Sequence, residues 1–344
     1  MVTTRSQHQA TILEVASKTP LQETKRLYSV EELISFVELA TVDPEYGTVV
    51  TFLRLNLTVS SLNRDIFDKY LPTCLVLTPN VTILELYVVP VIPTTALSDI
   101  LLPAIEVLET NLPHRVLVPF VGRNPSIRAL QLRHCGRARQ CALSTVTLEH
   151  VNEIHCPAKC APAIVHEKVD RLRLDIRRNS DLSSEFLSRF RAPLSTLYVL
   201  TIEFGVEDAD ILRAIARNMP WLRNLKMIEK CGSPVHKHKA RPWADRARWS
   251  GTLQKLPQLE RLLISTHGAL STTVGDHSSE EGIFRRWVGP SHPSLSYIGV
   301  WQRVSSSGSS HAFGDNVFSE WSREDGIWRG KWTKNADVDD FAIF

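Results

Sequence analysis

The residue types best suited to chemistry form a cluster of cysteines and histidines between positions 134 and 166. Its members are His134, Cys135, Cys141, His150, His155, Cys156, Cys160 and His166. Structural zinc takes four thiolate or imidazole ligands in a tetrahedron, commonly with pairs about two to four residues apart. Cys156 and Cys160 fit that spacing, and Cys135 and Cys141 fit it more loosely. The pattern predicts either a zinc site formed by Cys135, Cys141, Cys156 and Cys160, or buried cysteines that act as small apolar side chains.

A second candidate is a basic stretch that also carries tryptophans. Between His236 and Trp249 the cations are Lys237, Lys239, Arg241, Arg246 and Arg248, and the only acid is Asp245. Trp243 and Trp249 lie among them. Cations neutralise phosphate and indoles stack on bases, so this stretch could bind nucleic acid. The alternative is a solvated loop that enters a helix with Trp249 packed inward.

Catalytic motifs are missing from the sequence. It contains neither a glycine-rich phosphate loop nor the Gly-x-Ser-x-Gly turn of serine hydrolases. His166-Glu167 begins like a zinc-protease helix, but Asp170 stands where the second histidine should be. We therefore expect no enzyme activity and no cofactor.

Composition excludes several classes of protein. The chain has 344 residues, of which 43% are hydrophobic and 22% charged, and its net charge is +3. These values argue against wholesale disorder and against a globally basic nucleic-acid binder. Glu14 interrupts the only apolar cluster near the start, and acids and prolines interrupt the most hydrophobic stretch, residues 84–108. We therefore expect no secretory signal, no membrane span and a cytoplasmic or nuclear location.

A short template recurs along the chain and must position these side chains. It reads apolar, two residues, apolar, one residue, apolar, and its eight copies begin at Val50, Val81, Ile127, Val169, Leu197, Leu222, Leu259 and Leu295. A ninth copy at Leu143 is possible. In five copies a proline stands two residues before the first apolar position. The last two apolar positions point to one face of a short strand, and the proline stops the preceding helix.

Helical segments separate several of these strands. Ser29 and Glu32 form a capping box before Leu33, and Ile211, Leu212 and Ile215 share one helix face. Strand, turn and helix repeating every 25 to 45 residues or so predict an α/β fold: an irregular leucine-rich-repeat-like solenoid with a C-terminal β-hairpin cap. The alternative is an ordinary α/β domain whose strands share Leu-x-Leu.

The repeat divides the chain into five predicted segments. Residues 1–28 are polar and predicted to be disordered, and the solenoid covers 29–302. A Ser/Gly-rich loop at 303–316 leads to a hairpin at 317–335, which turns at Glu324-Asp325-Gly326. A tail of residues 336–344 follows.

Several repeats resemble those of a known family. Asn124-Pro-Ser-Ile-Arg-Ala-Leu-Gln-Leu132, Met219-Pro-Trp-Leu-Arg-Asn-Leu-Lys-Met227 and the copies ending at Ile264 and Val300 are similar to repeats of the fungal, mushroom-type F-box/leucine-rich-repeat proteins. The tail Trp321…Trp328…Trp332 is also similar. The resemblance covers residues 46–335 and implies a ubiquitin-ligase substrate receptor. Residues 1–45, however, lack the Leu-Pro-acid start and the tryptophan of an F-box.

The residues between the paired apolar positions are expected to face outward on the strands. Arginine, tyrosine and tryptophan are the commonest hot-spot residues at protein interfaces. The predicted partner-binding residues are therefore Arg54, Tyr87, Arg171, Arg173, Lys226, Arg261, Tyr297 and Trp301; the alternative is that they are ordinary solvated strand residues. The leading hypothesis is a non-catalytic protein-interaction module that binds a protein partner or degradation substrate. The alternatives are a ligase receptor with a degenerate F-box, which would also bind a ligase adaptor and cullin, and a nucleic-acid-binding protein.

Overall fold

The computed structural model describes residues 23–59, 64–89, 93, 95–135, 140–178, 181–230, 240–267, 270, 277–288, 292–303 and 316–334. The chain divides into two compact units, residues 1–128 and residues 129–344. Both have mixed α/β architecture, which confirms the predicted fold class at that level. Within the described residues, no helix is long and apolar enough to cross a bilayer.

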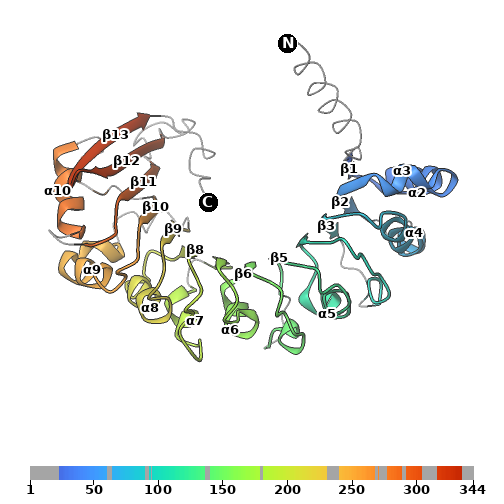
Figure 1. Ribbon diagram of the computed structural model, residues 1–344, viewed down its shortest axis with the longest axis horizontal. Helices are drawn as coiled ribbons and strands as arrows, with labels where there is room; N and C mark the ends of the chain where they lie inside the picture. Colours follow the sequence, from blue (N-terminus) through green and yellow to red (C-terminus); the bar gives the residue numbers. More distant parts are fainter. Residues whose placement is uncertain are drawn as a thin grey trace, which may run out of the picture. The chain divides into compact units, whose positions relative to one another are not determined.

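The first unit is built on parallel strands that follow chain order. They are β1 (Glu23–Leu27), β2 (Val50–Thr58), β3 (Ile83–Val89) and β4 (Val107–Thr110). The helices are α2 (Val30–Val42), α3 (Pro44–Thr48), α4 (Arg64–Leu77) and α5 (His114–Arg123). Figure 1 shows α2, α3 and α4 on one side of these strands.

Helix α2 begins where the capping box predicts. The Ser29 side chain accepts a hydrogen bond from the Glu32 backbone N–H, and the Glu32 carboxylate accepts one from the Tyr28 N–H at 2.7 Å. The predicted apolar face, which includes Leu33, Phe36 and Val37, is buried. These bonds satisfy backbone donors that would otherwise lack partners at the helix start.

The second unit has a longer run of strands in chain order. Its parallel strands are β5 (Ala129–Leu132), β6 (Glu153–Pro157), β7 (Arg171–Asp175), β8 (Val199–Phe204), β9 (Asn224–Glu229), β10 (Arg261–Thr266) and β11 (Tyr297–Arg303). Two antiparallel strands follow, β12 (Asn316–Glu324) and β13 (Ile327–Lys334).

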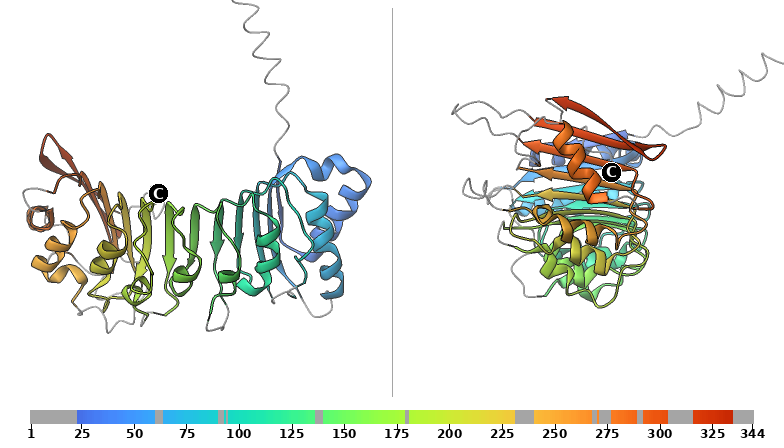
Figure 2. Two further views of the ribbon diagram at one scale, coloured as in Figure 1. Left: turned by 60° about the horizontal axis from the view of Figure 1, so that its bottom comes forward. Right: turned by 90° about the vertical axis from the view of Figure 1, so that its left-hand side faces the viewer.

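Helical segments cover one face of this second sheet (Figures 1 and 2). The α-helices are α6 (Ala161–Ile164), α7 (Ser183–Leu187), α8 (Ile211–Asn218), α9 (Arg246–Leu253) and α10 (His277–Val288). The 3-10 helices are η2 (Ala142–Thr145), η3 (Ala158–Cys160) and η5 (Pro242–Ala244). Where the structure describes them, the connections after β5 and β6 contain short helical turns, whereas α8, α9 and α10 are longer.

The apolar positions of all eight repeat copies are buried, so the template correctly identifies the core face of each strand. The structure adds two copies that end in a small or polar residue. They are Ile105-x-x-Leu108-x-Thr110 on β4 and Val151-x-x-Ile154-x-Cys156 on β6. The Thr110 hydroxyl donates to the Leu86 carbonyl at 2.7 Å, which satisfies its polar atom in the core.

Two details differ from the sequence interpretation. Residues 23–27 form β1, although the segment 1–28 was expected to be disordered. The possible ninth copy at Leu143 is wrong, because residues 142–145 form η2 and the strand lies at β6 instead. The remaining residues of the predicted segments 1–28, 303–316 and 336–344 lie mostly outside the described residues.

The antiparallel pair β12–β13 turns at the expected dipeptide. Asp325 and Gly326 have φ values of 50° and 80°. Both lie in the left-handed region, where glycine and aspartate are tolerated best, and such turns match the twist of paired strands. An antiparallel pair, Asn316–Glu324 with Ile327–Lys334, is therefore present in the segment where the hairpin was predicted.

Candidate partner-binding face of the sheet

The outward positions of the second unit lie in register across its strands. One row runs from His155 through Arg173, Thr201 and Lys226 to Leu263. A neighbouring row contains Glu153, Arg171, Val199, Asn224, Arg261 and Tyr297. Parallel pairing with matched register aligns equivalent repeat positions, as the template predicts. Five of the predicted partner-binding residues thus belong to one sheet face: Arg171, Arg173, Lys226, Arg261 and Tyr297.

Two cations of the first row influence each other. Arg173 and Lys226 lie on either side of Thr201 in the register. Lys226 is half-buried, and burial, followed by the positive charge of Arg173, lowers the pKa of its ammonium group from 10.5 to about 8. Desolvation and a like charge both disfavour the protonated amine. A negative charge placed near Lys226 would therefore stabilise its protonated form.

Asp175 is the acid nearest to this row. Its carboxylate lies 2.5 Å from His155 Nε2 and 3.5 Å from Arg173 Nε. Burial acts to raise the pKa of Asp175, but the hydrogen bonds and charges of His155 and Arg173 outweigh it and leave that pKa below its ordinary value. Asp175 is therefore held ionised by two partners on the same face.

Arg261 and Tyr297 form the next part of the face. The Arg261 guanidinium carbon lies 4.8 Å from the centroid of the Tyr297 ring, which is a cation–π geometry. Burial and the neighbouring Glu320 raise the pKa of Tyr297 to about 12, so the phenol stays protonated at neutral pH. Stacking limits the rotamers of Arg261. Arg171, on the same row, is exposed.

Trp301 is not available on this surface, which corrects the prediction. Only 4% of it is exposed, and it packs with Leu263 and Phe318 in an apolar cluster that also contacts Tyr297. The antiparallel strand β12 places Phe318 opposite Trp301. The template did not identify Phe318 because it lies outside the repeats, although its place in the predicted hairpin was a usable signal. The chain itself therefore covers this end of the sheet face.

Arg54 and Tyr87 lie on the strands of the first unit, and each is bonded to an acid on the next strand. Arg54 Nε lies 3.0 Å from Glu85 Oε2, and the Tyr87 hydroxyl donates to Glu109 Oε1. The hydrogen bond satisfies the Tyr87 hydroxyl, and the ion pair balances the charge of Arg54. The four predicted cations of the second unit, in contrast, lie on one sheet face, where Arg173 also pairs with Asp175.

The basic stretch at 236–249 does not form a stacking surface. Trp243 and Trp249 are 6% and 2% exposed, and their ring centroids lie 5.9 Å apart. Both pack against Trp287 in the core. An indole buried in this way cannot stack on a base, so the aromatic part of the nucleic-acid interpretation is wrong.

The cations of that stretch are also largely committed. Arg241 forms a buried ion pair with Glu229 at 3.3 Å, and Arg248 is paired with Asp210. Arg246 is exposed, and Lys237 and Lys239 lie outside the described residues. The described part of the stretch thus packs and pairs within the protein.

Three of the four predicted zinc ligands lie together. The Sγ atoms of Cys135, Cys141 and Cys160 are all within 4.8 Å of one another. Hydrogen bonding to Cys141, burial and Cys135 raise the pKa of the Cys160 thiol above its ordinary value. Cys156 is not a member of this group, because it occupies the buried third apolar position of the β6 repeat.

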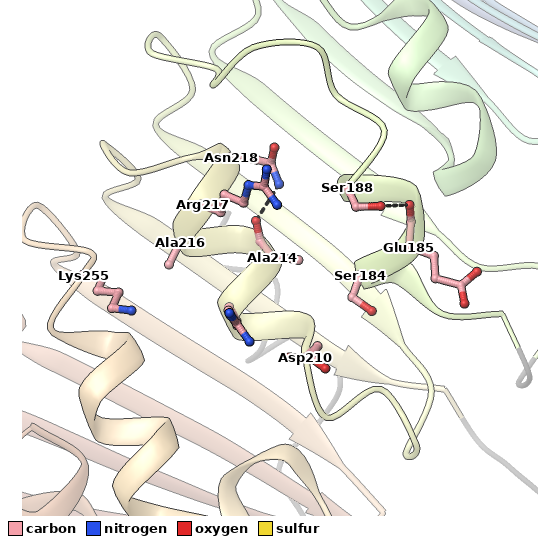
Figure 3. Close-up of a pocket in the computed structure, with 10 residues that line it drawn as sticks. Ser184, Glu185, Ser188, Asp210, Ala214, Ala216, Arg217, Asn218 and Lys255 are labelled. Atoms are coloured by element: carbon pink, nitrogen blue, oxygen red, sulfur yellow. Dashed lines mark hydrogen bonds between the residues drawn. The ribbon is translucent and has the colours of Figure 1, made fainter.

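The helix layer of the second unit contains a hollow of about 610 Å³ between α7, α8 and the end of α9 (Figure 3). Its charged lining includes Glu185, Asp210, Arg213, Arg217 and Lys255. The Ser188 hydroxyl donates to the Glu185 carbonyl at 2.7 Å, and the Ser184 hydroxyl donates to Asp208. The first bond is local to α7 and the second joins α7 to the segment before α8, so the described lining offers mixed charge and no serine paired with a histidine base.

The sequence matches no protein-family model, and no curated protein matches it. Function is therefore inferred from the sheet face.

Proposed function

We propose that this chain is a non-catalytic protein-interaction module whose basic sheet face, formed by Arg171, Arg173, Lys226 and Arg261, binds an acidic segment of a protein partner. The observation that supports this most directly is the desolvated Lys226 facing the charge of Arg173. A carboxylate placed between them would relieve the repulsion and stabilise both cations.

The spacing of these cations suits an extended peptide. Neighbouring strands lie about 4.8 Å apart, so Arg173 on β7 and Lys226 on β9 are separated by roughly 10 Å along the sheet. Three residues of a polyproline II segment span about 9 Å and complete one turn, so residues i and i+3 face the same side. Acidic residues at every third position of a partner would therefore face successive cations. The stacked Arg261 on β10 would offer a preorganised guanidinium to a third acid.

The finer fold belongs to the same proposal: an irregular leucine-rich-repeat-like solenoid with the β12–β13 hairpin as its cap. The burial of every repeat position supports it, because one unit cannot cover its apolar face without its neighbour. The resemblance to F-box/leucine-rich-repeat proteins suggests a degradation substrate as the partner. Residues 23–58 form β1, α2, α3 and β2, and this strand–helix–strand arrangement favours an interaction module over a ligase receptor.

The test uses the full chain and a synthetic peptide with glutamate at every third position. Fluorescence anisotropy is measured for wild type and for the double variant Arg173→Glu, Arg261→Glu. The control is Arg213→Glu, Arg217→Glu, which makes the same charge change at exposed positions of α8. We expect the sheet variant to bind at least about tenfold more weakly and the helix variant to bind like wild type. The helix variant should keep the wild-type melting temperature, and circular dichroism should show that the sheet variant is folded at the assay temperature.

Three results would overturn the proposal. They are equal losses in both variants, no peptide binding by wild type at millimolar concentrations, or tighter binding of a single-stranded oligonucleotide than of the peptide. Affinity purification with wild type and the sheet variant then identifies the physiological partner. Recovery of ligase adaptor and cullin with both proteins would favour the receptor alternative.

A further inference from the structure

We propose that Cys135, Cys141 and Cys160 bind a structural zinc ion that ties together the two loops following β5 and β6. The three sulfur atoms already lie within 4.8 Å of one another. Zinc–sulfur bonds of about 2.3 Å in a tetrahedron place ligand sulfurs about 3.8 Å apart. Only small side-chain movements separate the observed arrangement from a zinc-bound one.

The three cysteines lie in the segments that follow two consecutive strands, β5 and β6. Cys135 follows β5, Cys141 is the N-cap of η2, and Cys160 is the last residue of η3. A metal at this point would connect the end of one strand–turn segment to the next. Such a link between segments distant in sequence is the usual structural role of zinc in small loop-rich regions.

The helical segments described in this part of the second unit are short. The four-residue η2 separates β5 from β6, and η3 with the four-residue α6 separates β6 from β7. Helices α8 and α9 each have eight residues and bury an apolar face. Where helices are too short to supply a core, natural domains add cross-links such as a metal.

A disulfide is the competing chemistry for these thiols. None of the five described cysteines is in a disulfide. Three sulfurs grouped at similar distances match a metal better than a bond between two, because pairing two of them would leave the third without a role. Zinc needs a fourth ligand, and the three sulfurs account for three of the four.

The experiment uses the full chain purified under reducing conditions without added metal or chelator. Elemental analysis should find about one zinc per chain. X-ray absorption at the zinc edge should show three sulfur neighbours at about 2.3 Å and one nitrogen or oxygen. Cys135→Ser, Cys141→Ser and Cys160→Ser should each lower the zinc content of the soluble protein severalfold.

Cys156→Ser is the matched control, because it changes a buried cysteine nearby that is outside the sulfur group. It should retain zinc at the wild-type level. If the ligand variants are insoluble, chelation of wild type should lower its melting temperature, and zinc should restore it. Zinc below about a tenth of an equivalent in wild type, a four-sulfur coordination shell, or equal zinc loss in the control would overturn the proposal.

Discussion

Replacing Lys226 with methionine should stabilise the protein while weakening its binding to an acidic partner. Methionine keeps the apolar stem and removes the charge that lies half-buried beside Arg173. A pKa lowered from 10.5 to about 8 corresponds at full strength to about 3 kcal/mol. Because the side chain is half-exposed, solvent screening reduces this to about 1 kcal/mol, a rise in melting temperature of about 1–2 °C.

The stabilisation should depend on pH with a definite sign. The pKa of Lys226 is lower in the folded state than in the unfolded state, so its positive charge destabilises the folded protein. This destabilisation has its full value below about pH 8, where the amine is protonated in both states. Wild type regains this stability as the pH rises from about 8, the pKa of Lys226 in the folded state, to 10.5, its pKa in the unfolded state. The advantage of Lys226→Met should therefore be largest at neutral pH and vanish above pH 10.5.

Urea denaturation of both proteins at several pH values measures this difference. Subtracting the two free energies of unfolding at each pH removes the contribution of groups that titrate in the same way in both proteins. Lys255→Met is the control, because Lys255 is an exposed lysine on the helix side, where the same change should have little effect. Peptide anisotropy on the same samples should show weaker binding by Lys226→Met. Wild-type binding should itself weaken as the pH rises through about 8, when Lys226 loses its proton.

The reasoning would be refuted by a destabilised Lys226→Met variant, or by a stability gain that stays constant to pH 11. Either result would mean that the charge of Lys226 does not lower the free energy of unfolding. If Lys226→Met is more stable than wild type but binds the peptide equally well, the two claims about Lys226 have different outcomes. Its charge then destabilises the fold as argued, but the residue does not belong to the binding surface.

Three further predictions concern the sheet that carries the face. Leu225→Asp places a charge at a fully buried repeat position and should cost several kcal/mol, seen as loss of the circular-dichroism melting transition. Asp175→Asn should destabilise by about 1 kcal/mol at pH 7, because its bond to His155 favours the ionised acid. That difference should disappear as the pH falls below 3.8 through the depressed folded-state pKa, and a constant difference down to pH 2 would exclude it. Gly299→Ala should cost about 1–2 kcal/mol by urea denaturation, since its Cβ would clash with Leu263; an unchanged midpoint would show that the cluster can yield.

The repeat shows which properties local sequence carries. A strand buried on one face repeats apolar residues with a period of two, so Leu53 and Leu55, for example, reveal the core face without any knowledge of partners. The capping box at Ser29 and the turn at Asp325-Gly326 are equally local, because backbone hydrogen bonds and φ preferences depend on neighbouring residues. The template missed the repeats that end at Thr110 and Cys156. A hydroxyl that is hydrogen-bonded, or a small thiol, can occupy a position that the template reserves for an apolar side chain.

Exposure, in contrast, depends on what the rest of the chain places above a residue. Trp301 points outward from its strand as its position indicates, yet Phe318 on an added strand covers it. Trp243 and Trp249 lie in a basic stretch, but the aromatic core around Trp287 buries them.

The sequence by itself determined the alternation of core and outward positions and the candidate ligands. Only the tertiary structure decided which cations share a face, which aromatics are covered and which three of the cysteines meet. Local propensities act within a few residues, whereas register, burial and charge proximity arise between segments tens of residues apart.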